Sequence, residues 1–211
     1  MKKILLSALF LLCLSPFLKA QEEEDWSIPV SFTGQNPVIS DFLTALLTRD
    51  YMGDSFGGIH DKWESYRLGR PLSDDCSFLV DQRNGYIRFD SSYTDEFGTY
   101  SSTAEYCFWN CSDGRHKLVA ENMLSFKDGE PFEGQMSGLS LYMYDSGTKK
   151  MVPVSAYDLG LDLDDVMPLD TNITVRWLPR TGKTIQYIFY APSGDAMAAF
   201  TWDGRKFKKA E

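Results

Sequence analysis

Short apolar runs joined by turn-forming dipeptides constrain the fold of this chain more than any other feature. Glycine reaches the positive φ angles that tight hairpin turns require. Each dipeptide therefore predicts an antiparallel hairpin, and together they predict a curved meander or sandwich of about 8–10 strands within residues 76–209. A complete β-propeller needs at least four blades of about 40 residues, too many for this chain once helices are counted. The dipeptides are Asn84-Gly85, Asp113-Gly114, Ser146-Gly147, Thr181-Gly182 and Asp203-Gly204.

Two helices are predicted before the strands, within residues 37–70. Asn36 is suited to cap the first helix, Pro37 to occupy its first position and Gly53 to end it. A second helix is predicted over residues 59–68, with Ile59, Trp63 and Tyr66 on one face. The apolar stripe of the first helix consists of Val38, Ile39, Phe42, Leu43, Leu46 and Leu47. The predicted fold class is α+β: one domain over residues 37–211, with the helices packed on the antiparallel strands.

The first twenty residues have the organisation of an export signal. Lys2 and Lys3 precede an apolar run at residues 4–14, and Ala20 provides a small residue for cleavage. A membrane-spanning helix needs about 20 apolar residues, more than this run contains. The residues before Cys13 lack the small side chains of a lipoprotein signal. We therefore predict a soluble exported protein of the periplasm or the extracellular space, without a lipid anchor.

The chain that remains after cleavage is strongly acidic. Residues 1–20 contain three lysines and no acidic residue, so the remainder has 18 basic and 30 acidic side chains, a formal net charge of −12. Nucleic-acid binding is not expected, because the sequence has no basic stripe to neutralise phosphates. Insertion into a membrane after cleavage is not expected either. Residues 21–36 begin with four acidic side chains and predict a flexible segment.

Three cysteines follow the signal, and the sequence leaves their state open. One interpretation pairs Cys76 with Cys107 or Cys111 in a disulfide, which an exported chain permits. Another has all three as buried thiols that pack as small apolar side chains. The three cysteines with His116 also supply four ligands of the types that zinc prefers.

A thiol and a histidine could form a nucleophilic pair. Cys111 and His116 lie on either side of a predicted turn, and Asp113 could orient the imidazole. The alternative is an exposed hairpin histidine beside a packed cysteine. The serine motif G-x-S-x-G is absent, since residues 134–138 have the wrong spacing.

An acidic stretch at residues 158–170 interrupts the strand pattern and predicts a long loop. Its carboxylates are of the type that calcium prefers, but the spacing does not match an EF-hand. A solvated loop is the alternative, and no cofactor is predicted. The candidate ligands are Asp158, Asp162, Asp164 and Asp165.

Aromatic residues make up 14% of the chain, and many recur at every second position of a predicted strand. One face of the sheet would then be lined with rings, which stack on sugars or anchor protein interfaces. The alternative places these rings in the core beneath the first helix. The predicted binding residues are Trp109, Tyr142, Tyr144, Trp177 and Trp202.

The order of these segments resembles a group of exported proteins of unknown function from gut-dwelling Gram-negative bacteria. The resemblance implies an exported location and an α+β layout, and it transfers no catalytic residue. The matching segments are Phe42-Leu43-Thr44-Ala45-Leu46, Asn84-Gly85-Tyr86-Ile87, Tyr106-Cys107-Phe108-Trp109, Trp177-Leu178-Pro179-Arg180 and Phe200-Thr201-Trp202-Asp203-Gly204.

The sequence thus favours a non-catalytic binding or interaction module of the bacterial envelope, with a protein or a glycan as its partner. One alternative is a small exported hydrolase that uses the Cys111–His116 pair. Another is an assembly subunit that pairs with its partner through an edge strand.

Overall fold

The computed structural model describes residues 26–48, 58–132 and 137–210, and twelve strands and two helices lie within them. The predicted signal, residues 21–25 of the predicted flexible segment and Gly53 lie outside these ranges. The rest of that segment is described, and Ile28–Pro29 within it forms a strand, so the prediction of flexibility is wrong there. The helices are α1 (Ile39–Leu47) and α2 (Ile59–Arg67). The strands are β1 (Ile28–Pro29), β2 (Cys76–Asp81), β3 (Tyr86–Asp95), β4 (Gly98–Asn110), β5 (His116–Lys127), β6 (Glu130–Phe132), β7 (Gly138–Asp145), β8 (Lys150–Val154), β9 (Ile173–Trp177), β10 (Thr184–Tyr190), β11 (Ala196–Trp202) and β12 (Phe207–Lys209).

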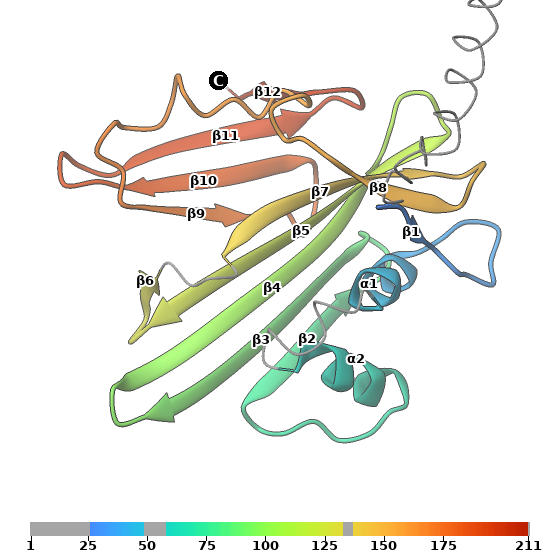
Figure 1. The fold of residues 1–211 in the computed structure, drawn as a ribbon, viewed down its shortest axis with the longest axis horizontal. Coiled ribbons are helices and arrows are strands. Elements are labelled where there is room, and N and C mark those ends of the chain that lie inside the picture. The colour runs from blue at the N-terminus through green and yellow to red at the C-terminus, as the bar shows by residue number, and fades with distance from the viewer. Residues whose placement is uncertain (1–25, 49–57, 133–136, 211) are drawn as a thin grey trace, which may run out of the picture.

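The strands form two antiparallel sheets (Figure 1). The larger has eight strands in the order β1-β8-β7-β5-β4-β3-β2, with β6 paired to β5 outside this path. The smaller has four strands in the order β12-β11-β10-β9. The long β3–β4 hairpin of the larger sheet extends away from the smaller sheet (Figure 1).

The larger sheet is covered on both faces. On one face, Phe42 of α1 packs against Tyr144 of β7, with ring centroids 5.2 Å apart. On the other face, Trp109 of β4 meets Phe207 of β12 edge to face at 5.7 Å. Since successive side chains of a strand point to opposite faces, β4 is buried on both sides: Tyr106 joins the helix-side core and Cys107 the core between the sheets.

The helices are short, and α1 begins later than predicted. Asn36 and Pro37 precede the helix, which starts at Ile39, so their predicted capping roles are wrong. The Val38 N–H instead donates to the Asp41 carboxylate at 2.8 Å, which satisfies a donor at the helix start. The second helix agrees with the prediction to within one residue, since α2 spans Ile59–Arg67.

All five predicted hairpins are confirmed, each between two consecutive antiparallel strands. These hairpins contain ten of the twelve strands, and the two that the dipeptide pattern did not mark are the short strands β1 and β6. The antiparallel part of the predicted fold class is therefore correct. The helical part is small, with two helices of nine residues each.

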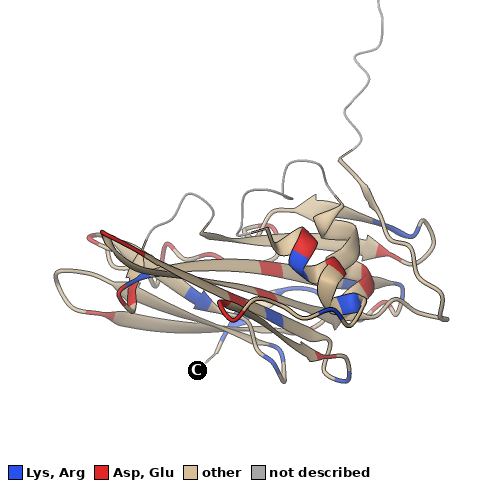
Figure 2. Cartoon of the chain, turned by 90° about the horizontal axis from the view of Figure 1, so that it is seen from below, with Lys and Arg blue, Asp and Glu red and all other residues tan. Residues whose placement is uncertain are grey.

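Charged residues are spread through this architecture. Acidic and basic positions lie interspersed on strands and loops, and neither sign gathers on one face in the view of Figure 2. Among the described residues, no helix has the length and apolar character needed to cross a membrane.

Candidate functional site

An open groove of about 440 Å³ lies where the smaller sheet stops covering the larger one. Ile87 and Phe89 of β3 point into the helix-side core, so the alternate side chains of this strand point to the opposite face. That face forms the floor of the groove, and the end of β9 supplies an aromatic wall. We call it the Trp177 groove; it is lined by Ser77, Arg88, Asp90, Ser101, Thr103 and Trp177, among others.

Two aromatic rings and a cation form one side of the groove. The Trp177 indole stacks on Phe126 of β5, with centroids 6.2 Å apart and planes inclined by 20°. The Arg88 guanidinium carbon lies 5.8 Å from the centre of the Trp177 ring, within the range of a cation–π interaction. This contact places a flat apolar surface directly beside a positive charge.

The Arg88 guanidinium is held by a carboxylate. Its Nε donates to both oxygens of Asp90, at 2.9 and 2.8 Å, and Thr103 Oγ1 donates to Asp90 Oδ1 at 2.7 Å. The bond to Asp90 raises the pKa of Arg88 above its ordinary value. The arginine and aspartate side chains remain 38% and 40% exposed, so both can still contact a ligand.

Hydroxyl groups extend the polar surface across three strands. Ser77 of β2 lies opposite Asp90, and Ser92 of β3 lies opposite Ser101 of β4 in the strand register. These serines line the groove. The site therefore combines an aromatic plane with rows of hydrogen-bonding groups.

The backbone on either side of Trp177 is fixed by buried polar residues of the larger sheet. Glu105 Oε2 accepts the Leu178 N–H at 2.9 Å, and the Asn122 side-chain amide donates to the Arg176 carbonyl at 2.8 Å. Glu105 is 2% exposed and Asn122 is fully buried. Glu105 also accepts hydrogen bonds from Tyr86 Oη at 2.7 Å and from Asn122. Trp177 is thus held between two anchored peptide groups, which orients its ring toward the groove.

The structure corrects the predicted aromatic binding surface. Four of the five predicted rings lie in the core, with exposed fractions of 0–5%, and only Trp177 lines the groove. The reason is that both faces of the larger sheet are covered, so rings on either face become buried. Trp109 and Trp202 pack between the sheets, whereas Tyr142 and Tyr144 pack on the helix side.

The predicted thiol–histidine pair lacks the electrostatics of an activated nucleophile. Burial, and then the nearby Asp113 carboxylate, raise the pKa of Cys111, whereas a nucleophilic thiol needs a lowered one. The Cys111 thiol faces Met143, with the two sulfurs 3.7 Å apart. His116 Nδ1 is 2.6 Å from Asp113 Oδ2, as the predicted orienting role of Asp113 requires. The two residues lie three positions apart in the hairpin turn, so the same contact also stabilises that turn.

The candidate disulfides and the candidate zinc site of the cysteines with His116 are not formed within the described ranges. The three cysteines within the described ranges are all free thiols. Cys76 packs in the helix-side core and Cys107 in the core between the sheets, so the larger sheet separates them. This separation prevents the predicted four-ligand set with Cys111 and His116 from converging.

The acidic stretch forms a loop between β8 and β9, as predicted. Leu159, Leu161 and Leu163 pack against the core between the sheets, so the intervening acidic side chains point outward. Within the described ranges, no three potential ligands lie close enough together to hold a metal ion. The candidate calcium ligands Asp158, Asp162, Asp164 and Asp165 are all exposed.

Most residues of the Trp177 groove were not singled out from the sequence. Arg88 and Asp90 alternate with buried apolar residues of β3, and such polar positions usually indicate only a solvent-facing side. The clearest signal is the run Ser101-Ser102-Thr103, which lies opposite residues 90–92. Hydroxyl residues repeated on adjacent strands, together with a Trp at the end of a strand, are the sequence pattern that could have predicted a binding face here.

Edge strands are present as the assembly hypothesis requires. The larger sheet ends at β1 and β2, and the smaller at β12 and β9. Pairing of these edges with another chain stays a prediction. Comparison of the chain with protein-family models, with curated proteins and with solved structures finds no match.

Proposed function

We propose that this chain is an exported, non-catalytic saccharide-binding protein of the bacterial envelope, with the Trp177 groove as its binding site. The observation that carries the proposal is the position of the Trp177 ring beside the Arg88–Asp90 pair on an open, hydroxyl-rich face. The predicted export signal supports a location where glycans are accessible.

The groove matches the two kinds of surface on a sugar ring. The C–H groups of one pyranose face are slightly positive and stack on the electron-rich face of an indole. The hydroxyl groups around the ring need donors and acceptors in one plane. Arg88 supplies donors, Asp90 supplies acceptors, and the serine hydroxyls supply both. Hydrogen bonds to charged groups are stronger than those between neutral groups, which favours the Arg88–Asp90 pair as the main polar contact.

The hydrogen bonds of Asp90 suit it to accept a bond from a sugar hydroxyl. Its carboxylate already accepts hydrogen bonds from Arg88 and Thr103. These bonds hold the carboxylate in one orientation. Asp90 therefore acts as a fixed acceptor that orients a sugar hydroxyl.

A direct test is binding of the purified chain from residue 21 onward to a glycan array, followed by calorimetric titration of the best ligand. Trp177→Ala should weaken binding by about tenfold or more, because the stacking surface is removed. Asp90→Asn should weaken it by a similar factor through loss of the charged acceptor. Trp26→Ala is the matched control, since Trp26 is 59% exposed and lies outside the groove.

Circular dichroism of each variant separates loss of the site from loss of the fold. The proposal fails if no glycan binds, or if the Trp26 variant loses as much affinity as the Trp177 variant. Capture of a protein at an edge strand, with the groove variants unaffected, would favour the assembly hypothesis instead.

A further inference from the structure

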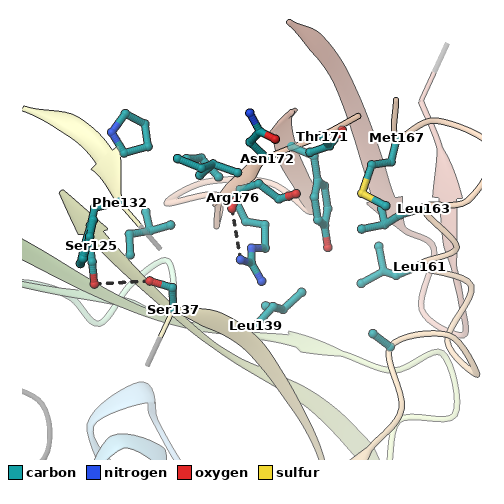
Figure 3. A pocket seen from close by; sticks show the side chains of 17 residues that line it. Ser125, Phe132, Ser137, Leu139, Leu161, Leu163, Met167, Thr171, Asn172 and Arg176 are labelled. Carbon is teal, nitrogen blue, oxygen red and sulfur yellow. Dashed lines mark hydrogen bonds between the residues drawn. The ribbon is translucent and has the colours of Figure 1, made fainter. Parts of the chain in front are cut away.

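A cavity lies between the two sheets, separate from the Trp177 groove. It has a volume of about 500 Å³, within the range of small-molecule sites. Figure 3 shows Leu161, Leu163 and Met167 of the β8–β9 loop on one side, Ser125, Phe132 and Ser137 on the other, and Arg176 between them. About half of its lining surface is apolar and half is polar, so an apolar chain can lie against one part while a polar group meets the other.

Tyr187 supplies a hydrogen-bonding group in this cavity. The residue is 2% exposed and lines the cavity from β10. Its ring packs edge to face on Phe200 at 5.7 Å, which fixes its position. Burial raises the pKa of Tyr187 to about 12, so the phenol keeps its proton and is a donor at neutral pH.

The Tyr187 hydroxyl makes no hydrogen bond to any residue in the described ranges. The hydroxyl is not fully enclosed by protein, so water or a ligand in the cavity can accept its hydrogen bond. The opening of the cavity at this residue provides space for a ligand atom. An oxygen acceptor on a ligand would complete the hydrogen bonding of this part of the core.

Arg176 adds a positive charge to the same cavity. Its Nη2 donates to the Thr174 carbonyl at 3.2 Å, which Figure 3 shows as a dashed line. Its charge also lowers the pKa of Tyr187, which places the guanidinium within electrostatic reach of the phenol. The polar end of a ligand therefore belongs on this side, with its apolar body toward Leu139, Leu161 and Leu163.

We infer that the cavity between the sheets binds a small aliphatic molecule that carries one terminal oxygen acceptor, a carbonyl or a carboxylate, at the Tyr187 hydroxyl. This inference is independent of saccharide binding, because no residue lines both the cavity and the Trp177 groove.

Calorimetric titration of the chain from residue 21 onward with decanoate and with 2-decanone tests this inference. At least one of the two should bind with one-to-one stoichiometry. Tyr187→Phe removes only the hydroxyl and should weaken binding about three- to tenfold, the worth of one hydrogen bond. Tyr190→Phe is the control, since Tyr190 lies on the same strand and does not line the cavity.

Leu163→Phe provides a second, independent variant. Leu163 is half-buried at the cavity wall, so a larger ring there reduces the space for the aliphatic body and should weaken both ligands. Tighter binding of decanoate than of 2-decanone would identify the acceptor as a carboxylate, and equal or weaker binding would identify it as a carbonyl.

The inference is overturned if neither compound binds, or if Tyr187→Phe binds as tightly as the unaltered protein. Saccharide binding by Tyr187→Phe should be unchanged, so that failure at this cavity and failure at the groove are distinguishable.

Discussion

Glu105 is the residue on which the position of the Trp177 groove most depends. Three donors converge on its carboxylate: the Tyr86 hydroxyl, the Asn122 amide and the Leu178 N–H. A buried charge is retained only when hydrogen bonds offset its desolvation. These bonds join β3, β5 and the end of β9, and so connect the two sheets through one side chain.

Replacement of Glu105 by Ala should lower the free energy of unfolding by about 3–5 kcal/mol, because it leaves three buried donors without their acceptor. Glu105→Gln keeps one acceptor oxygen and should cost less, about 1–3 kcal/mol. Urea denaturation followed by circular dichroism measures both values. Glu130→Gln, at an exposed position of β6, is the control and should have little effect. Equal stability of all three variants would show that Glu105 does not join the sheets.

At the scale of elements, hairpins were predictable because their turns carry a local signal. Gly85, between β2 and β3, has a φ of +66°, which glycine adopts without strain. The sequence could not reveal that Phe108 of the neighbouring strand packs over this turn. A Cβ atom at Gly85 would lie 2.7 Å from the Phe108 ring, closer than van der Waals contact allows.

Gly85→Ala should therefore destabilise the fold more than Gly114→Ala, although both glycines have nearly the same φ. Gly114 has a φ of +69° and open space around the position of a Cβ, so its substitution carries only the backbone cost of about 1–2 kcal/mol. Gly85→Ala should add about 1–3 kcal/mol for displacement of the Phe108 ring. Thermal unfolding of the two variants side by side gives the difference. Equal losses would mean that the ring moves aside freely.

The burial of the aromatic rings shows what strand patterns leave undetermined. Alternation places Tyr106 and Trp109 on opposite faces of β4, but it does not say whether either face is covered. Here α1 covers one face and the smaller sheet covers the other, so both rings become core. Trp177 differs because it is the last residue of an edge strand, at the point where the smaller sheet no longer covers the larger one. That distinction depends on the order of strands in space, which short-range sequence signals do not determine.

For the whole molecule, the Asp81–Arg180 ion pair joins the end of β2 to the β9–β10 loop, at 2.8 Å. Hydrogen bonds from Asn84 and Arg180 lower the pKa of Asp81 to about 2. The unfolded chain has an ordinary aspartate pKa of about 4, so it binds more protons than the folded chain between these values. The stabilisation is therefore complete above pH 4 and is lost as the pH falls toward 2.

Asp81→Asn should lower the thermal midpoint at pH 6 and make its decline between pH 4 and pH 2 shallower than in the unaltered protein. Part of the decline remains, since the pKa of Asp113 is also lowered to about 2. Calorimetric scans at several pH values measure both effects. Asp165→Asn, at an exposed loop position, should leave the profile unchanged. Identical profiles for Asp81→Asn and the unaltered protein would contradict a role for this pair in acid sensitivity.

Strand β9 separates the cavity from the Trp177 groove, since Arg176 lines the cavity while its neighbour Trp177 lines the groove. The saccharide and the aliphatic molecule proposed above would contact neighbouring residues of this strand. Thermodynamic linkage then makes the effect reciprocal. If a ligand in the cavity changes the affinity of the groove by some factor, a ligand in the groove changes the affinity of the cavity by the same factor. The two proposed sites share no residue, so any coupling between them must pass through the backbone of β9.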